Sequence, residues 1–173
     1  SLGFELKRAG WDGIVITGKS DRLVGIEIND AEIALTDAAA LEGLDTGRTA
    51  AVLEGKGSCA VIGPAAERGV LFACLIVDRH FAAGRNGIGL CFAAKNIKYM
   101  TVRGSGKVRV RDPEGLKRAR EDILRLVAAS PALSGEFGLA NFGTPALYDL
   151  MDARRMMPTG NFRRTQFEGA AEM

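Results

Sequence analysis

The chain has 173 residues, of which 47% are hydrophobic and 25% are charged, and its net charge is only +2. This length and apolar content suffice for one sizeable core, so an intrinsically disordered chain is excluded. The basic residues are scattered among acidic ones, so the basic face that a nucleic-acid partner requires is missing. No apolar run reaches the roughly 18 residues of a membrane span, and the start lacks a signal-peptide pattern. We therefore expect a soluble, cytoplasmic protein with no membrane partner.

Short β-branched runs punctuated by glycine dominate residues 3–110. This pattern predicts strands separated by turns, with short helices between some of them. Asn29 and Asp30 stand between two of the runs and favour a tight turn, so we expect a β-hairpin there. The stretch 63–69 is interpreted as a turn. The expected strands are 13–17, 23–28, 32–36, 59–62, 70–77 and 99–103, and the expected helices are 4–9, 46–54 and 87–95.

The pattern becomes helical in the last third of the chain. Asp112, followed by a proline, combines an N-cap with a residue that suits the first helical position. Apolar residues then recur at helical spacing until a Ser-Pro pair at Ser130 ends the run, and Thr144 begins a further helix in the same way. The sequence thus predicts an α+β chain, with a β-rich domain over residues 3–110 and an all-helical segment over residues 111–173.

Two segments of the β-rich region, residues 3–18 and 89–104, share one pattern. Each reads as a glycine, a short amphipathic helix, a residue suited to a left-handed cap, and an apolar strand that ends at glycine. The cap residues are Gly10 and Asn96, which fall at equivalent places. The pattern indicates a duplicated unit related by a pseudo-twofold axis, with chance similarity as the alternative. The first copy lacks the strands that precede the second, so we expect the chain to begin inside a domain.

Three cysteines and one histidine limit the chemistry that this chain can support. Cys59, Cys74 and Cys91 lie singly among apolar residues, and their spacing matches no zinc or iron–sulfur ligand set, so we interpret them as core residues. With His80 as the only histidine, the chain lacks the parts of a Ser-His-Asp relay or a histidine-rich metal site. We expect the reactive groups to come from elsewhere.

The segment 82–89, which reads Ala-Ala-Gly-Arg-Asn-Gly-Ile-Gly, is the motif with chemical content. Its glycines lie between a strand and a helix, so backbone N–H groups can converge on an anion without obstruction by Cβ atoms. Arg85 could add a bidentate contact to a phosphate from the same turn. A glycine-rich connection with a solvated arginine is the alternative interpretation. The segment is no Walker motif, and its spacing is wrong for a dinucleotide fingerprint.

Further motifs accompany this segment, and they lie at 63–64, 95–98, 102–104, 142–144, 158–162 and 167–169. In order and combination these motifs resemble the N-terminal region of the tungsten-containing aldehyde:ferredoxin oxidoreductases, over almost the whole chain. The resemblance implies oxidation of aldehydes to carboxylic acids with ferredoxin as the electron acceptor. It also implies a tungsten bis-pterin cofactor, Mg²⁺ at the pterin phosphates and a [4Fe–4S] cluster in the full-length protein.

The same resemblance implies where the cofactor binds. In the family this loop lies against the pterin phosphates, and a backbone carbonyl at the position of Ala82 helps to bind Mg²⁺. Members often carry a basic residue just before the loop, where this chain has Phe81. No catalytic residue is implied within the chain. The implied cofactor-binding residues are Ala82, Ala83, Gly84, Arg85, Asn86 and Gly87.

Two functional hypotheses follow from these observations. The first is a cofactor-binding fragment of the oxidoreductase, inactive by itself and without bound cofactor. The second is a non-catalytic ligand-binding or assembly module on the same scaffold. For the first, the expected partners of the complete enzyme are ferredoxin or a similar electron carrier and an aldehyde substrate, without nucleic acid. A homo-oligomer is compatible with the sequence.

Overall fold

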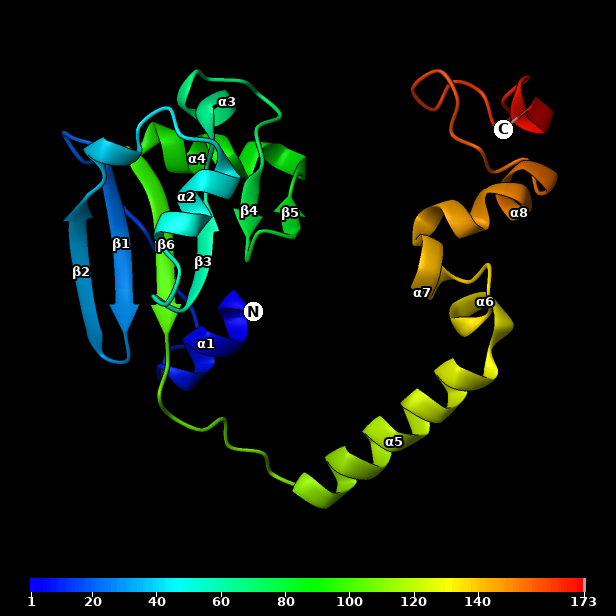
Figure 1. Cartoon of the computed structure of the whole chain (residues 1–173), viewed down its shortest axis with the longest axis horizontal. Coiled ribbons are helices and arrows are strands. Elements are labelled where there is room, and N and C mark those ends of the chain that lie inside the picture. Colours follow the sequence, from blue (N-terminus) through cyan, green and yellow to red (C-terminus); the bar gives the residue numbers. More distant parts are fainter. Residues whose placement is uncertain (173) are drawn as a thin grey trace. The chain divides into compact units, whose positions relative to one another are not determined.

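The computed structural model describes residues 1–172, and the chain divides into two units, Ser1–Arg109 and Val110–Met173. The first unit is a mixed six-stranded sheet with short helices (Figure 1), and the second consists of helices and turns. The expected α+β class is confirmed.

Six strands form one sheet in the first unit. They are β1 (Val24–Asn29), β2 (Glu32–Asp37), β3 (Ser58–Val61), β4 (Leu75–Val77), β5 (Phe81–Ala83) and β6 (Ile97–Arg103). Their order in the sheet is β2-β1-β6-β3-β4-β5, with β6 parallel to β1 and antiparallel to β3. The expected hairpin is confirmed, because β1 and β2 pair antiparallel and Asp30 turns between them with a φ of 50°. β5 is an edge strand of the sheet.

Short helices connect these strands. They are α1 (Leu2–Arg8), η1 (Ala39–Leu41), α2 (Thr46–Val52), α3 (Pro64–Glu67), η2 (Arg85–Gly87) and α4 (Ile88–Ala94), where η denotes a 3₁₀ helix. The helices expected at 4–9, 46–54 and 87–95 are thereby confirmed. The interpretation of 63–69 as a turn only was wrong, because Pro64 occupies the first position of a one-turn helix.

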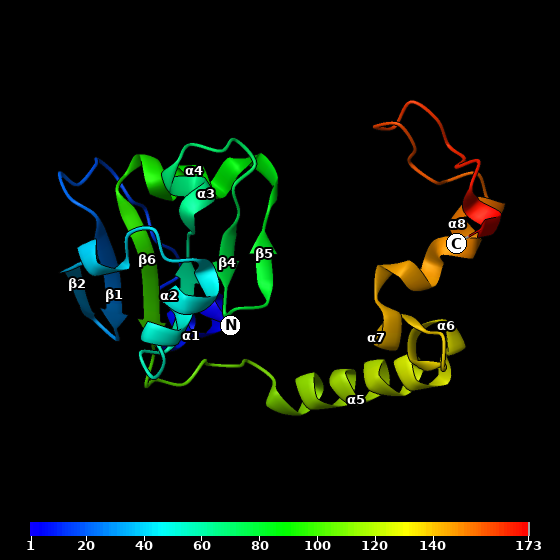
Figure 2. The same cartoon turned by 45° about the horizontal axis from the view of Figure 1, so that its top comes forward.

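Helices pack against both faces of the sheet (Figure 2). On one face, Ala9 after α1 and Phe92 of α4 pack with Ile26 and other apolar residues of β1 and β6. On the opposite face, Ala50 of α2 packs with Tyr99 of β6. Because the pleat of a strand sends alternate side chains to opposite faces, the two helix layers fix the register of the central strands.

The structure corrects two of the expected strands and adds one. Residues 13–17 form no strand, the strand expected over 70–77 is confined to β4, and β5 was not expected at all. A strand requires a neighbouring strand with which to form backbone hydrogen bonds. The residue composition of a segment does not indicate whether such a neighbour is present. β5 is too short, at three residues, to show the alternation that reveals a strand.

The comparison of segments 3–18 and 89–104 is therefore only half confirmed. Both begin with a helix, α1 and α4, and both caps have a positive φ, 94° at Gly10 and 56° at Asn96. The helix in the second segment leads into the central strand β6, whereas the first leads into unpaired backbone. Two helix-then-strand units related by a pseudo-twofold axis were the wrong prediction for this chain.

The second unit consists of helical elements. They are α5 (Pro113–Ala129), α6 (Pro131–Ser134), α7 (Leu139–Phe142), η3 (Thr144–Leu147), α8 (Tyr148–Ala153) and η4 (Ala170–Glu172). The expected N-cap is confirmed, because an Asp112 side-chain oxygen accepts a hydrogen bond of 2.8 Å from the Gly115 N–H. Within the described residues, no single helix is long and apolar enough to cross a membrane; only the bent pair Pro113–Ala129 and Pro131–Phe142 passes by length and composition.

Candidate functional site

All six residues implied as cofactor-binding lie in one continuous connection at the edge of the sheet. Ala82 and Ala83 belong to β5, and Ala82 pairs with Ile76 of β4. Gly84 is right-handed, with φ −96° and ψ −29°, whereas Asn86 is left-handed, with φ 66° and ψ 14°. Gly87 is also left-handed, with φ 62° and ψ 36°, before α4 begins. We call residues 84–87 the edge turn.

The edge turn offers hydrogen-bond donors that the protein itself does not use. In the part of the chain that the structure describes, the backbone N–H groups of Arg85 and Asn86 have no hydrogen-bond acceptor. Arg85 is exposed, and its guanidinium has no ion-pair partner among those residues. Backbone segments that change handedness turn successive N–H groups toward one side, which is the geometry of an anion-binding nest. The arrangement can therefore bind an anion with backbone and side-chain donors together.

Segment 71–74 packs against the edge turn and the start of α4. This packing explains one glycine in each, Gly87 and Gly89. A Cβ atom at Gly87 would lie 2.8 Å from the Leu71 carbonyl oxygen, and one at Gly89 would lie 2.7 Å from that of Ala73. The Gly89 N–H also donates to the Ala73 carbonyl at 3.2 Å. These glycines are thus required for close packing within the protein, and Gly87 also for its positive φ. The sequence had suggested either close approach of an anion or a plain glycine-rich connection, and neither interpretation included this packing.

Asp78 anchors the hairpin that carries β5, a role that was not expected from the sequence. One Asp78 carboxylate oxygen accepts hydrogen bonds from the Ser58 hydroxyl at 2.6 Å and from the Cys59 N–H at 3.0 Å. Asp78 and Arg79 both have a positive φ, 49° and 67°, which reverses the chain between β4 and β5. The signal available in the sequence was an aspartate directly after an apolar run, a residue type that tolerates this conformation.

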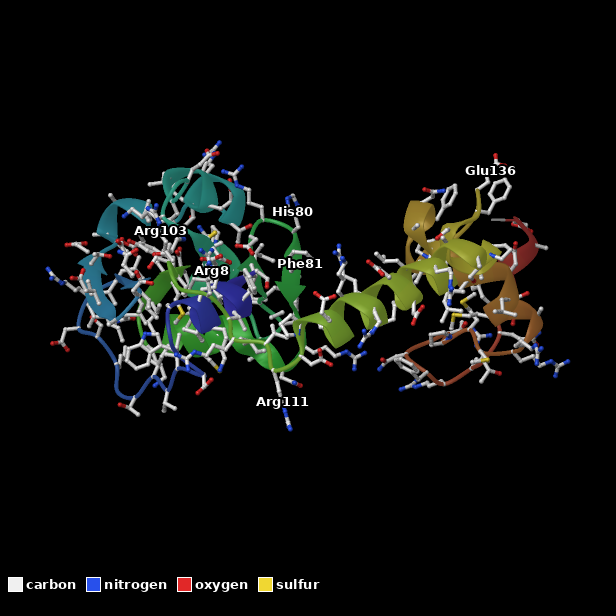
Figure 3. All side chains as sticks on the ribbon, turned by 90° about the horizontal axis from the view of Figure 1, so that it is seen from below. Arg8, His80, Phe81, Arg103, Arg111 and Glu136 are labelled. Carbon is white, nitrogen blue, oxygen red and sulfur yellow. The ribbon has the colours of Figure 1, made fainter. Side chains whose placement is uncertain are left out.

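The part of the sequence that contains the edge turn carries no negative charge, because residues 79–109 contain no acidic residue. Of its basic residues, Arg79 is paired with Glu54 and the Lys95 ammonium donates to the Gly18 carbonyl. The His80 ring points away from the body of the first unit (Figure 3). Phe81, at the start of β5, is 64% exposed. Arg85 is therefore the cation that the turn itself contributes.

The three cysteines occupy three different environments. Cys59 is buried, Cys74 is half-buried and Cys91 is exposed, and all three are free thiols. The interpretation as core residues is confirmed for Cys59, whose pKa is raised by burial and by the nearby Asp78 carboxylate. It was wrong for Cys91, because this position of α4 faces solvent. Among the described residues, no group of three or more His, Cys, Asp or Glu side chains could hold a metal ion.

A polar network lies on β1, β2 and β6, separated from the edge turn by β3, β4 and β5 in the sheet order. A Glu27 carboxylate oxygen accepts hydrogen bonds of 2.7 Å from the Tyr99 hydroxyl and from the Lys56 ammonium. The hydrogen bond from Lys56 holds the pKa of Glu27 below its ordinary value. Burial, and then Glu27, raises the pKa of Tyr99. Each charge is compensated, so we assign this network to stability.

Similarity to known proteins shows the family of this chain. Residues 1–104 match the family described as aldehyde ferredoxin oxidoreductase, N-terminal domain. The chain belongs to this family. It is 35% identical over 176 residues to the tungsten-containing aldehyde ferredoxin oxidoreductase of Pyrococcus horikoshii, and that match covers 99% of this chain and 29% of the relative. The chain thus spans less than a third of the length of that relative.

Members of the family differ in the substrates their names describe. The aliphatic sulfonate oxidoreductase, WOR-like subunit, of Pyrococcus furiosus is 31% identical over 134 residues, covering 67% of this chain and 22% of that protein. A solved structure titled active site complex BamBC of benzoyl coenzyme A reductase in complex with 1,5-dienoyl-CoA matches with a TM-score of 0.68 and 33% identity. That match covers 75% of this chain and 21% of that one. The relatives are oxidoreductases, and the resemblance stated from the motifs is confirmed at the level of the family.

Proposed function

We propose that the edge turn binds the phosphates of a tungsten-pterin cofactor, in an oxidoreductase that oxidises aldehydes to carboxylic acids and passes the electrons to ferredoxin. The observation that carries this proposal is the donor set, which consists of the Arg85 and Asn86 N–H groups without acceptors and the Arg85 guanidinium without an ion-pair partner among the described residues. Phosphate oxygens are acceptors only, and charge-assisted hydrogen bonds from arginine to phosphate are among the strongest in proteins. The residues of the turn therefore fit a phosphate group.

The role of this chain is to bind and orient. When bound, the tungsten-pterin group supplies the two-electron chemistry. The backbone donors and Arg85 would fix the phosphate end of the group, which positions the rest of it without touching the reacting carbonyl. Because Gly87 and Gly89 pack directly on segment 71–74, which leads into β4, this segment holds the turn in place.

The proposed Mg²⁺ contact is the backbone carbonyl of Ala82. Mg²⁺ prefers six oxygen ligands and keeps several waters, so one carbonyl would complete a set made mainly of phosphate oxygens and water. The iron–sulfur cluster proposed for the complete enzyme requires several cysteines together. Cys59 lies in β3, Cys74 directly before β4 and Cys91 in α4, so the ligands of such a cluster would come from polypeptide outside this chain.

The test compares two arginines in the native protein that contains this chain, purified without oxygen. Arg85→Ala removes a charge-assisted contact worth about 1.5–3 kcal/mol, so cofactor affinity should fall roughly 10- to 100-fold. Tungsten and pterin content per polypeptide should drop, while turnover per tungsten should stay within about twofold, because the arginine acts far from the chemistry. Arg79→Ala, in the same hairpin but outside the turn, is the matched control.

Cofactor content that is equal in the wild type, Arg85→Ala and Arg79→Ala would contradict the proposal. Wild-type protein that binds no tungsten after anaerobic purification would instead favour a non-catalytic module on the same scaffold. Gly87→Val is unsuitable as a test, because its side chain would collide with Leu71 whether or not a ligand binds.

A further inference from the structure

A polar hollow lies at the end of the sheet where β4 and β6 finish, and we call it the end hollow. Its volume is about 760 Å³, and every residue that lines it belongs to the first unit. The lining comes from α1 and its N-cap, the turn between α2 and β3, the β4–β5 hairpin and the end of β6. Its walls include Arg8 and Arg103, which lie over the same part of the first unit (Figure 3). The edge turn follows β5, so the two places lie at opposite ends of the β4–β5 hairpin.

Both acidic side chains of the end hollow bind donors of the protein itself. Glu5 accepts hydrogen bonds of 3.0 Å from the Arg8 guanidinium and from the Gly104 N–H. The Asp78 carboxylate accepts the two hydrogen bonds from β3 that anchor its hairpin. Two basic side chains, Arg8 and Arg103, line the same hollow, so its acidic and basic side chains are equal in number. The unused groups, rather than the net charge, therefore determine what the end hollow can bind.

The unused groups of the end hollow are hydrogen-bond donors. Arg103 is exposed, and its guanidinium forms no hydrogen bond or ion pair with any residue that the structure describes. The backbone N–H groups of Gly55 and Gly57, in the turn before β3, likewise have no acceptor among those residues. Both glycines have a positive φ, 84° and 102°. A guanidinium together with backbone N–H groups of a glycine turn is a donor set that suits an oxyanion.

Contacts of the following residues fix the backbone that carries Arg103. The Ser105 N–H donates to the Asp30 carboxylate at 2.7 Å. A Cβ atom at Gly104 would lie 2.3 Å from the Ala9 nitrogen, so the chain after β6 packs directly on the end of α1. A guanidinium on a backbone that is already ordered loses less conformational freedom on binding than one on a mobile loop. The position of Arg103 is therefore suited to binding a ligand.

We propose that the end hollow binds the phosphate group of a small molecule, with the Arg103 guanidinium and the N–H groups of Gly55 and Gly57 as donors. Phosphate oxygens are strong acceptors, and the planar guanidinium can bind two of them at once. The volume of about 760 Å³ leaves room for the remainder of the molecule that carries the phosphate. The end hollow shares no residue with the edge turn, so this inference is independent of the proposed cofactor site.

Titration of the isolated chain with inorganic phosphate tests the donor set, with the amide NMR shifts of Gly55 and Gly57 as the readout. In the wild type both amides should shift and reach saturation at millimolar phosphate. Arg103→Ala should weaken this binding at least about tenfold, because it removes a charge-assisted contact. Arg85→Ala is the matched control, since it removes another exposed arginine, that of the edge turn, and should leave both titrations unchanged.

Three results of this titration would overturn the proposal. The first is an absence of any response of Gly55 and Gly57 to phosphate, and the second is equal affinity in the wild type and Arg103→Ala. The third is equal affinity for acetate and phosphate, which would make the end hollow a general site for carboxylates.

A second measurement uses the native protein that contains this chain. Phenylglyoxal modifies accessible arginine side chains, and mass spectrometry reports the rate for Arg103. With phosphate at about ten times its Kd, modification of Arg103 should slow roughly tenfold, because only the free site reacts. Arg48, an exposed arginine of α2, is the control and should react at the same rate throughout. An Arg103 that resists the reagent without phosphate would mean that other polypeptide covers the hollow, and this would overturn the proposal.

Discussion

The two units of this chain bury their apolar residues very differently. Among the described residues, every buried hydrophobic side chain lies between Ala9 and Val102, and the second unit has none. Yet α5 has a clear amphipathic pattern, with Leu116 57%, Ile123 60% and Leu126 68% exposed. Periodicity specifies a helix and its apolar stripe, but stability comes from the surface that covers that stripe. We infer that the first unit is stable by itself and that the second depends on contacts beyond it.

The largest effect should come from the buried ion pair of the first unit. Lys98 is fully buried, and its ammonium donates to the Glu67 carboxylate and, at 2.8 Å, to the Leu44 carbonyl. Glu67→Gln leaves this charge without a counterion and should lower the free energy of unfolding by about 3–5 kcal/mol. Urea unfolding followed by the fluorescence of Trp11, the single tryptophan of the chain, measures this change in the first unit.

The matched control breaks an ion pair in the second unit. Arg125 and Asp122 of α5 pair at 3.1 Å with both side chains exposed. Asp122→Asn should alter stability by less than about 1 kcal/mol and leave the Trp11 transition unchanged. A shift of that transition as large as the one caused by Glu67→Gln would mean that the two units unfold together. It would contradict the inference that the first unit is stable by itself.

A smaller loss should follow from overpacking behind the edge turn. Gly89→Ala places a Cβ atom 2.7 Å from two carbonyl oxygens of segment 71–74 and should cost about 1–3 kcal/mol. Gly3→Ala in α1 has open space around it and should instead stabilise the helix by about 0.5–1 kcal/mol. Equal unfolding midpoints for the two variants would show that segment 71–74 does not hold the turn.

The pH dependence of the first unit should reveal Glu27. Its pKa is lowered from the ordinary value of 4.5, first by the hydrogen bond from Lys56. The native state therefore binds this proton less tightly than the unfolded state does. The contribution of Glu27 to the free energy of unfolding is full above its ordinary pKa and is lost as the pH falls through its lowered native pKa. Glu27→Gln should remove about 1–2 kcal/mol at neutral pH and flatten the acid side of the stability profile. An unchanged profile would rule out this contribution.

The smallest effect is expected on the exposed face of α5. Leu126→Ala removes an apolar side chain that is 68% exposed, so the stability of the isolated chain should change by less than about 0.5 kcal/mol. Ile26→Ala, which empties a buried position of β1, should cost about 2–5 kcal/mol in the same assay. Similar losses in both variants would show that α5 is covered within the chain.

Sequence patterns that specify helix caps and turns predicted the structure correctly. Patterns that specify strands failed where the strand depends on a distant pairing partner. Gly10 and Asn96 adopt positive φ as expected, and Asp112 caps α5, because caps depend on a few neighbouring residues. The motif at 82–89 was recognised as a connection into a helix for the same reason, and the helix α4 begins within it. The strand expected at 13–17 failed because pairing depends on residues far away or on another polypeptide.

Several contacts of the candidate site could not be predicted from the sequence. Gly89 and Gly87 looked like positions kept small for a ligand, whereas the carbonyls that they face belong to segment 71–74. Asp78 gave no sign that it would tie the β4–β5 hairpin to β3. Such contacts join residues that periodicity and turn chemistry treat separately, so only the folded chain reveals them.

The most direct test of the account is an experimental structure of the native, anaerobically purified protein with its cofactor bound. We expect phosphate oxygens within about 3 Å of the N–H groups of Arg85 or Asn86, with the Arg85 guanidinium on the same phosphate. Pterin phosphates held entirely by other residues, with the edge turn contacting only solvent, would contradict the central claim.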